Sequence, residues 1–394
     1  MIRLTNGRIV LKDRIIEGRD LIIREDIIEG LPERNEAIHI EGNREVELVD
    51  VNGAYITPGF VDIHADYIEQ MGAPRPTSMM DLNLAMRETE RVLATHGITT
   101  MFHSLSIMKD MSFDKNPIRQ MKYVRTLTDI IDEIERGQKL IRHKFHARFE
   151  MESVDCIEEL KGFINDGKVD LVSFMDHSPG QGQYSNVERY REDLIKMDND
   201  LNEDNVDDYL ESIKTVEKAS HQECIEIAEL ARSKNIAVAS HDDDTMEKLD
   251  CNEEIGVTIS EFPIRIDVAK KAKEKGFHTI AGAPNVMLGG SHSGNLAAHE
   301  AIQEGCIDIL CSDYYPASML HSVFKLHETY GHDLAEMFAL VTINPAKAVK
   351  LDDVLGSIEI GKKADLLVID KLEETYPVVS RCYVNGSEVM RMSY

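Results

Sequence analysis

The chain has 394 residues, with 44 Lys and Arg against 71 Asp and Glu, which gives a formal net charge of −27. This charge excludes a dedicated nucleic-acid-binding protein, which would carry a basic surface, and the hydrophobic fraction of 42% excludes a disordered chain. The six cysteines form no CxxC pair, and no apolar run approaches the roughly 20 residues of a membrane span. We therefore expect a cytoplasmic protein with neither a nucleic-acid nor a membrane partner.

Both ends of the chain show the short alternation of apolar and polar residues that is typical of β-strands. Residues 1–57 contain runs such as IRLTNGRIVL and DLIIRED, separated by Gly and Asn, which predicts antiparallel hairpins. Residues 356–394 have the same character and include SRCYVNGSEV, with an Asn-Gly turn. We predict one small β-sandwich domain built from 1–57 and 356–394.

The central part, residues 58–355, alternates short apolar or β-branched runs with amphipathic helical patterns. The runs predicted as strands are 59–64, 98–105, 144–151, 170–177, 236–243, 257–262, 278–285 and 308–315. Eight strands separated by helices point to an α/β fold, a (β/α)8 TIM-like barrel. A doubly wound sheet is the competing topology, which is disfavoured because no GxGxxG motif follows any strand.

The segment 187–211 is unusually acidic and lies between the fourth and fifth predicted strands. A solvated helical excursion is the favoured interpretation. A lid over the site is the alternative, because the active sites of such barrels are built from the loops after the strands.

Five of the eight predicted strands end in residues that can bind metal ions. They are His64 and Asp66, Glu150, Asp176 and His177, His241 to Asp243, and Asp313. These strand ends would converge on one face of a barrel, so together they predict a divalent metal site. Taken singly, each histidine is more often structural, and Asp243 and Asp244 suit the cap of the following helix. Nine further histidines are assigned no chemistry: His96, His143, His146, His221, His278, His299, His321, His327 and His332.

Two further features suit a phosphate group. GAPNVMLGGSHSGN, residues 282–295, would expose backbone N–H groups before a helix, with Gly290, Ser291, His292 and Ser293 as the candidate contacts. Arg75 stands between prolines in APRP, and a guanidinium offers phosphate two donors in a fixed fork. The alternatives are a flexible connection and a surface turn.

At these residues the sequence resembles the amidohydrolase superfamily, through the first-strand motif GFVDIHAD and the return GSIEIGKKADLLVID into the β domain. The resemblance narrows to one family, the α-D-ribose 1-methylphosphonate 5-triphosphate diphosphatases of the carbon–phosphorus lyase pathway. The motifs that recur in family order are PGFVDIHAD, PRP, MDHSPGQ, ASHDD, EFP, GAPN…GGSHSGN and SDYYPASML.

The resemblance implies a metal-dependent hydrolase that converts the 5-triphosphate of this ribose phosphonate to the 5-phosphate and pyrophosphate. It implies one or two divalent ions, with Zn²⁺ expected first and Mn²⁺ as the alternative, and a dimer or higher oligomer. The implied metal ligands are His64, Asp66, Glu150, His177, His241 and Asp313. Asp313 would also orient or deprotonate the attacking water. Arg75, Arg148 and the loop residues would neutralise phosphate charge.

The chain departs from the superfamily pattern in its ligands. The superfamily has HxH on the first strand and often a carboxylated lysine between the metals, whereas here Asp66 takes the second position and Glu150 is the candidate substitute for the lysine. The superfamily usually has its later histidines on strands five and six, whereas the predicted strands put His177 and His241 on four and five. Either a strand is missed or the ligand set is arranged differently.

Two other functions stay open at this point. An amidohydrolase that acts on a cyclic amide or an N-acyl compound, like a dihydroorotase or a deacetylase, would use the same metals on a carbonyl. It would have little use for Arg75 or the glycine-rich loop. A scaffold that has lost catalysis would lack part of the ligand set, and here the set is filled.

Overall fold

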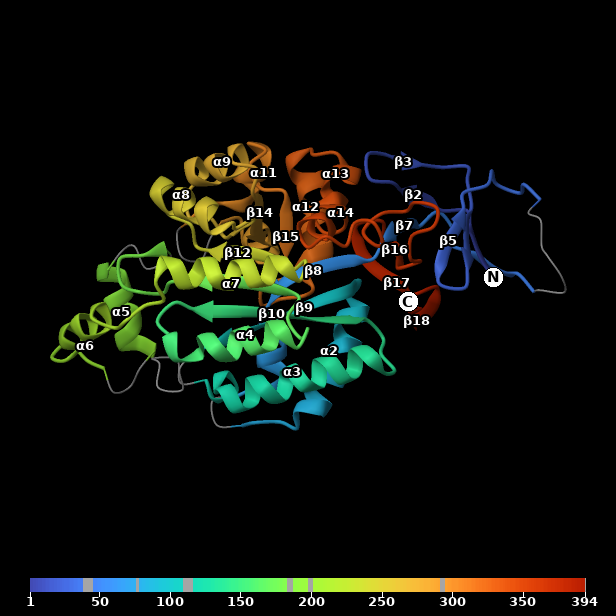
Figure 1. Ribbon diagram of the computed structural model, residues 1–394. Coiled ribbons are helices and arrows are strands. Elements are labelled where there is room, and N and C mark those ends of the chain that lie inside the picture. The colour runs from blue at the N-terminus through green and yellow to red at the C-terminus, as the bar shows by residue number, and fades with distance from the viewer. Residues whose placement is uncertain are drawn as a thin grey trace.

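The computed structural model describes residues 1–37, 45–75, 78–108, 116–182, 187–197, 201–290 and 295–393. A barrel forms the middle of the molecule (Figure 1). A region of β-sheets that carries both termini lies at the right, and the helices α5 (Val187–Met197) and α6 (Val206–Lys214) project at the left.

Eight parallel strands form the barrel, and each overlaps one of the predicted runs. They are β8 (Phe60–Ala65), β9 (Ile98–Ile107), β10 (Arg142–Glu150), β11 (Leu171–Met175), β12 (Ala237–His241), β13 (Ile259–Glu261), β14 (His278–Gly282) and β15 (Ile309–Cys311). The strands are hydrogen-bonded in chain order, and a parallel bridge between Ala65 and Asp313 brings the end of β15 beside β8. The predicted (β/α)8 fold is therefore confirmed, and the doubly wound alternative is wrong because the last strand returns to the first.

Helices surround the barrel and cover its outer face. They are α1 (Tyr67–Gly72), α2 (Leu82–Thr95), α3 (Met121–Arg136), α4 (Ile157–Asn165), α7 (His221–Ser233), α8 (Met246–Ile255), α9 (Ile266–Glu274), α10 (Ala283–Leu288), α11 (Ala298–Gln303), α12 (Ser318–Tyr330), α13 (Leu334–Ala339) and α14 (Ile343–Ala348), with short 3₁₀ turns η1 (Pro117–Arg119) and η2 (Val154–Cys156). In α2 the Asp81 side chain accepts a hydrogen bond from the N–H of Leu84 at 2.8 Å, and Gly97 follows the helix end with φ +84°. A membrane crossing would need a longer and more apolar helix than any among the described residues.

Strand β10 shows how the barrel separates apolar and polar side chains. Its residues Phe145, Ala147 and Phe149 pack in the apolar layer beneath the helices. Because side chains alternate along a strand, the intervening His146, Arg148 and Glu150 face the barrel interior. The polar face of this one strand therefore contributes to the site described below.

The two ends of the chain form two packed sheets, which confirms the small β-sandwich. Its strands are β1 (Ile2–Thr5), β2 (Arg8–Val10), β3 (Ile15–Ile16), β4 (Leu21–Arg24), β5 (Ile27–Gly30), β6 (Glu47–Asp50), β7 (Tyr55–Pro58), β16 (Leu366–Leu372), β17 (Tyr376–Val384) and β18 (Ser387–Arg391). The sheet β5-β4-β1-β6 contributes Leu4 and Ile23 to a buried cluster, and the sheet β18-β17-β16-β7-β2-β3 contributes Ile56 and Val368.

The pairing in these sheets differs in part from the predicted antiparallel hairpins. The β17–β18 hairpin turns through Asn385 and Gly386, both left-handed with φ +49° and +73°, as an Asn-Gly turn should. Strands β4–β5 and β2–β3 are also antiparallel, but β1–β6 and β2–β7 are parallel. Local alternation predicts a strand but cannot predict its partner. The two strands of each parallel pair are separated along the chain by strands of the other sheet: β2 and β3 lie between β1 and β6, and β4 to β6 lie between β2 and β7.

A sheltered cation links the β-sandwich to the barrel. The Arg142 guanidinium, at the start of β10, donates to the side chains of Asp365 and Asn385. The side chains of Arg142 and Asp365 are 12% and 5% exposed. We propose 1–57 with 356–394 as the β domain and 58–355 as the barrel domain.

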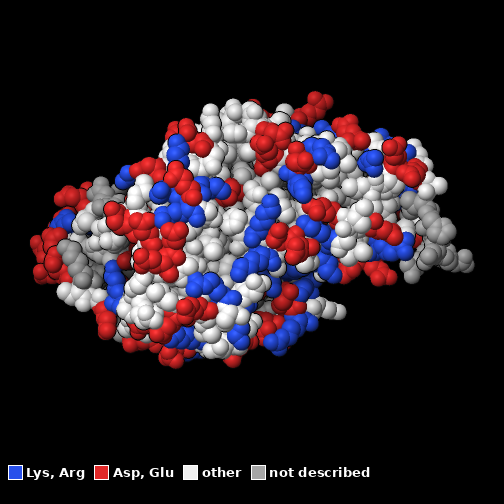
Figure 2. Space-filling view, turned by 45° about the horizontal axis from the view of Figure 1, so that its top comes forward, with Lys and Arg blue, Asp and Glu red and all other residues white. Residues whose placement is uncertain are grey.

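The acidic segment 187–211 is a helical excursion between β11 and β12. Helices α5 and α6 pack on each other through Tyr190, Leu194, Val206 and Leu210, a cluster separate from the barrel core. Figure 2 shows Asp and Glu side chains gathered at this end of the molecule. The helices account for the segment as an excursion, and its role as a lid stays a prediction.

The carboxyl group of Asp308, just before β15, leads us to expect that acid destabilises the barrel. Burial opposes ionisation of its carboxyl group, but the nearby His278 side chain and hydrogen bonds from Lys273 and the Thr279 N–H outweigh burial and lower the pKa from the ordinary 3.8 to about 2. The ionised carboxylate therefore adds about 2 kcal/mol of stability above pH 4, which is lost as the pH falls toward 2. In thermal melts, Asp308→Asn should lower the melting temperature at pH 6, and its deficit should shrink below pH 4. Asp353→Asn removes an exposed carboxylate and should show no such deficit, and a deficit that is independent of pH would contradict the account.

Candidate functional site

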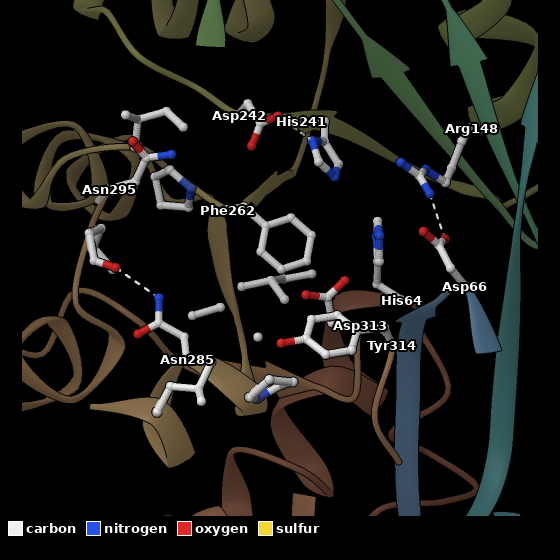
Figure 3. Close-up of a pocket in the computed structure, with 18 residues that line it drawn as sticks. His64, Asp66, Arg148, His241, Asp242, Phe262, Asn285, Asn295, Asp313 and Tyr314 are labelled. Carbon is white, nitrogen blue, oxygen red and sulfur yellow. Dashed lines mark hydrogen bonds and ion pairs between the residues drawn. The ribbon is translucent and has the colours of Figure 1, made fainter. Parts of the chain in front are cut away.

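The carboxyl ends of the barrel strands surround a cavity of about 300 Å³. Figure 3 shows Arg148, Asp66 and His64 at one side of this cavity and Asn285 and Asn295 at the other. The ionisable side chains that line it are His64, Asp66, Arg148, His241, Asp242 and Asp313. The structure therefore brings together four of the six predicted metal ligands and one predicted phosphate contact.

The first group of ligand-type side chains consists of His64, His146 and Glu261, from β8, β10 and β13. All three are buried, and their ligand atoms lie within 4.8 Å of one another. His64 Nδ1 is 3.1 Å and His146 Nε2 is 3.8 Å from the same atom, Glu261 Oε1. Burial opposes ionisation of Glu261, but the two imidazoles outweigh burial and lower its pKa to about 2. Glu261 is therefore an ionised carboxylate inside the barrel.

Serine hydroxyls hold His146 in this group. Its Nδ1 lies 3.1 Å from Ser104 Oγ and its Nε2 lies 2.9 Å from Ser173 Oγ. Burial lowers the pKa of His146 to about 3, so the imidazole is neutral, which is the form that binds metals. A metal ion at Nε2 would compete with Ser173, so Ser173 sets how readily this histidine can act as a ligand.

The second group consists of His177, His241 and Asp242, which follow strands β11 and β12. His241 Nδ1 lies 2.9 Å from Asp242 Oδ2, and His177 Nδ1 lies 3.0 Å from Glu150 Oε1. Burial opposes the charged form of His177, but the Glu150 carboxylate outweighs burial and raises its pKa. The rings of His64 and His241 have centroids 5.3 Å apart, so the two groups adjoin.

Two arginines hold the carboxylate of Asp66, which is a predicted metal ligand. Arg148 Nη1 lies 2.5 Å from Oδ1, and Arg119 Nη2 lies 3.7 Å from Oδ2. Burial opposes ionisation of Asp66, but Arg148 and Arg119 outweigh burial and lower its pKa. A metal ion would compete with Arg148 for this carboxylate, so a ligand role for Asp66 stays a prediction.

Asp313 lies where β15 meets β8, and its backbone closes the barrel. Its N–H donates to the carbonyl of His64 at 3.1 Å, and its carbonyl accepts from the N–H of Asp66 at 2.7 Å. Burial raises the pKa of the Asp313 carboxyl group, and His64 offsets part of this effect. A Cβ atom on Gly282 would lie 3.2 Å from Asp313 Oδ2, so the glycine leaves space for this carboxylate.

Three residues after strand ends have left-handed backbones. Asp242, Phe262 and Asp313 have φ of +54°, +54° and +58°. Aspartate tolerates this conformation, whereas a bulky residue such as Phe262 rarely adopts it, and such strain collects at functional sites. The Phe262 ring packs against His64 and His241, with centroids 4.9 and 5.0 Å apart. The strained turn therefore places an apolar wall against one histidine from each group.

The two groups fit a divalent metal ion. Imidazole nitrogens and carboxylate oxygens are the usual ligands of Zn²⁺ and suit Mn²⁺ as well. Three buried atoms of these groups lack hydrogen-bond partners: His241 Nδ1, Asp242 Oδ2 and Glu261 Oε2. The close approach of His241 and Asp242 does not have hydrogen-bond geometry. Buried polar atoms left unpaired are costly, and metal ligation would satisfy them.

The predicted phosphate contacts Arg75 and Arg148 lie in different surroundings. Arg148 lines the cavity and is buried. Arg75 is exposed, its carbonyl accepts a hydrogen bond from the Ser78 N–H at 2.9 Å, and it is not among the described residues that line the cavity. Phosphate binding by Arg75 therefore stays a prediction.

Of the four candidate contacts in the glycine-rich loop, the structure describes Gly290. Ser291, His292 and Ser293 lie outside the described residues. The N–H of Gly290 donates to the carbonyl of Asn285 at 3.1 Å, so this N–H is already used within the protein. Phosphate binding by Gly290 stays a prediction.

The sequence interpretation missed two ligand-type residues, Glu261 and His146. Glu261 ends β13 and stands in the motif EFP, so the strand-end argument applied to it as well. His146 was assigned no chemistry, yet it alternates with Arg148 and Glu150 along β10, and this period of two was the signal that places all three inside the barrel.

The alternative that Asp243 caps the helix after β12 is also wrong. Thr245 is the N-cap of α8, and its side chain accepts from the Lys248 N–H at 3.1 Å. Asp243 is instead buried, with partners that are described below.

The comparison with known proteins agrees with this arrangement. A model of the amidohydrolase family matches residues 55–390. The chain belongs to the amidohydrolase family. This amidohydrolase is 32% identical over 368 residues to alpha-D-ribose 1-methylphosphonate 5-triphosphate diphosphatase of Escherichia coli (strain K12). The matched residues cover 93% of this chain and 94% of the relative.

Other relatives of this amidohydrolase are more distant. It is 26% identical over 350 residues to imidazolonepropionase of Fusobacterium nucleatum subsp. nucleatum, covering 84% of this chain and 80% of the relative. Among solved structures it resembles 5-methylcytosine deaminase from Klebsiella pneumoniae, with a TM-score of 0.64, 17% identity and coverage of 100% and 98% of the two chains. This last likeness shows the fold.

The observed strand order answers whether a strand was missed before His177 and His241. The barrel has eight strands and none was missed. The ligand-type residues are therefore arranged differently from the usual superfamily pattern: His177 follows strand four, His241 ends strand five, and Glu261 ends strand six, where a histidine is usual.

Replacing Glu261 should test whether its carboxylate belongs to a metal centre. Glu261→Gln keeps the shape but removes the charge between His64 and His146, so the dissociation constant for Zn²⁺ should rise about ten- to hundredfold. Glu90→Gln is the matched control, because Glu90 Oε2 pairs with His143 Nε2 at 3.3 Å on the outer side of the barrel. Calorimetric titration of metal-depleted protein measures both, and equal affinities for the two variants would contradict the assignment.

Proposed function

We propose that this amidohydrolase is a metal-dependent diphosphatase that cleaves α-D-ribose 1-methylphosphonate 5-triphosphate to the 5-phosphate and pyrophosphate, in phosphonate catabolism. The observation that carries the proposal is the 32% identity to the Escherichia coli diphosphatase over 93% of this chain. The buried histidines and carboxylates at the strand ends support it, because they supply the ligands that such a hydrolase needs.

The proposed cofactor is a divalent cation, Zn²⁺ before Mn²⁺. His64, His146 and Glu261 would hold one ion, and His177 with His241 and Asp242 would hold a second. The predicted ligands Asp66, Glu150 and Asp313 border these groups and remain part of the proposal. A bound divalent ion lowers the pKa of its water to about 7 and polarises the phosphoryl group under attack.

The charge of the cavity supports this need for metal. Among the described residues that line it, three carboxylates face one guanidinium, so the protein alone presents a net negative site to a triphosphate. One divalent ion balances this excess, and a second makes the cavity positive. The proposal therefore requires at least one ion and favours two.

Protein side chains carry the remaining tasks. Asp313 is the proposed general base, because its carboxylate faces the cavity and burial raises its pKa toward that of a better proton acceptor. Arg148 is the described cation of the cavity lining, and it stabilises negative charge as that charge moves to the leaving pyrophosphate. Asp66 orients Arg148 through their ion pair.

Removing the proposed base should abolish most of the turnover. Asp313→Asn keeps the volume and loses the proton acceptor, so kcat should fall about 10²–10⁴-fold. Phosphorus NMR follows pyrophosphate and 5-phosphate release from a ribose 5-triphosphate in the presence of Zn²⁺ or Mn²⁺. Normal turnover by Asp313→Asn would reject the assigned base. Failure on triphosphates together with turnover of a dihydropyrimidine or an N-acyl amino acid would reject the diphosphatase proposal.

The space beside Asp313 offers a gentler test. Gly282→Ala would place a Cβ atom 3.2 Å from Asp313 Oδ2, so the carboxylate must move by a few tenths of an ångström. A small displacement of a catalytic group is costly, and kcat should fall about tenfold or more while the melting temperature changes little. Gly162→Ala in α4 is the control, since among the described residues no atom outside the helix itself lies within 4 Å of a Cβ there. Unchanged kcat in Gly282→Ala would show that the position of Asp313 is not critical.

A further inference from the structure

A buried carboxylate, Asp243, lies beside both groups of ligand-type residues without belonging to either. It follows Asp242 directly, and its side chain is 0% exposed. A carboxylate is stable in such a place only when its oxygens are hydrogen-bonded or paired with a cation. Its partners therefore show what it holds in place.

The carboxylate of Asp243 joins two strands and a helix. Ser240 Oγ of β12 donates to it at 2.8 Å, and Ser260 Oγ of β13 donates at 2.5 Å. Asn252 Nδ2 of α8 donates to the same carboxylate at 2.9 Å and to Ser240 Oγ at 2.8 Å. One side chain thus fixes the ends of two neighbouring barrel strands against the following helix.

The two serines precede ligand-type residues. Ser240 pairs with Ser260 in the β12–β13 register, and His241 pairs with Glu261 in the next position. Glu261 belongs to the first group and His241 to the second. By tying Ser240 to Ser260, Asp243 fixes the pair immediately before the two ligands and so sets the distance between the two groups.

Lys248 fixes the turn on the other side of these ligands. Its Nζ donates to the carbonyls of His241 at 2.8 Å and Asp242 at 3.1 Å, and lies 3.7 Å from Asp243 Oδ1. The N–H of Asp242 donates to the carbonyl of Glu261 at 2.8 Å. These bonds hold Asp242 in its left-handed conformation, with φ +54°.

We propose that Asp243 is a positioning residue that sets the spacing of the two metal-binding groups by fixing His241 and Glu261 relative to each other. The inference rests on the proposed metal centre. Asp243 itself would touch neither metal nor substrate, and it acts through Ser240, Ser260 and Lys248. Loss of its charge should therefore weaken metal binding in a protein that is still folded.

The test compares two carboxylates at opposite ends of the barrel strands, the buried Asp243 and the partly buried Asp308. Asp243→Asn should raise the dissociation constant for Zn²⁺ at least about tenfold, as loss of groups that orient ligands does. Asp308→Asn removes a carboxylate that accepts from the Thr279 N–H and hydroxyl and from Lys273, away from the cavity. Both variants should melt at lower temperature, but Asp308→Asn should bind Zn²⁺ within twofold of the wild type. Calorimetric titration of metal-depleted protein gives the affinity, and thermal melting gives the stability.

A lower melting temperature with unchanged Zn²⁺ affinity in Asp243→Asn would overturn the inference, as would an equal loss of affinity in Asp308→Asn. If Asp243→Asn does not fold, Ser260→Ala and Thr279→Ala form a milder pair, since each loses one hydroxyl donor to one of these carboxylates. Ser260→Ala should weaken Zn²⁺ binding and Thr279→Ala should not, and equal affinities would reject the inference.

Failure of the proposed function gives different results. A wild-type protein that binds no Zn²⁺ or Mn²⁺ would reject the metal centre and the role of Asp243 together. A wild-type protein that binds the metal but does not cleave triphosphates would reject the reaction alone, and the role of Asp243 would stand.

Discussion

A carboxylate can stay ionised where eight strand ends meet only if a cationic or hydrogen-bonding side chain lies beside it. The rest of the site depends on this constraint. Glu261 lies between the imidazoles of His64 and His146, and Asp66 lies between Arg148 and Arg119. Each carboxylate is ionised because its neighbours outweigh the cost of burial. These pairs hold the side chains in fixed positions, so the barrel presents a preformed set of ligand atoms instead of one that must assemble around a metal.

The strand ends were predictable from the sequence because each is a local feature. A short apolar run followed by a histidine or an aspartate can be recognised within ten residues or so, and this rule located His64, His241 and Asp313. The same rule applied to Glu261. What it could not provide was the partner of each group: His64 and Glu261 are 197 positions apart, and only closure of the barrel brings them within 3.1 Å.

Asp243 and Arg75 show that a local sequence pattern does not predict the surroundings of a side chain in the fold. An aspartate two residues past a strand and just before a helix has the local pattern of a helix cap, yet Asp243 binds across two strands and a helix. Arg75, flanked by prolines, has the local pattern of a held anion contact, yet its side chain is exposed and does not line the cavity. Local spacing predicts which residues can do chemistry, whereas the burial and the partners of each residue depend on the whole fold.

The acidic composition is compatible with the proposed anionic substrate because the acidic side chains on the surface lie apart from the cationic groups proposed to bind that substrate inside the barrel. Acidic side chains gather on the surface of the end formed by α5 and α6 (Figure 2), whereas Arg148 is buried inside the barrel. At the cavity, the protein supplies an excess of carboxylates that metal ions would reverse. The affinity for a triphosphate should thus depend on the metals far more than on the net charge of −27.

The most direct test of this account is an anomalous diffraction map from crystals of the protein grown with Zn²⁺, recorded at the zinc absorption edge. The account predicts one peak bound to His64 and Glu261 and a second bound to His177 and His241, with Zn–N distances of about 2.0–2.1 Å. A map with no peak inside the barrel, or with zinc bound only to surface carboxylates, would contradict it.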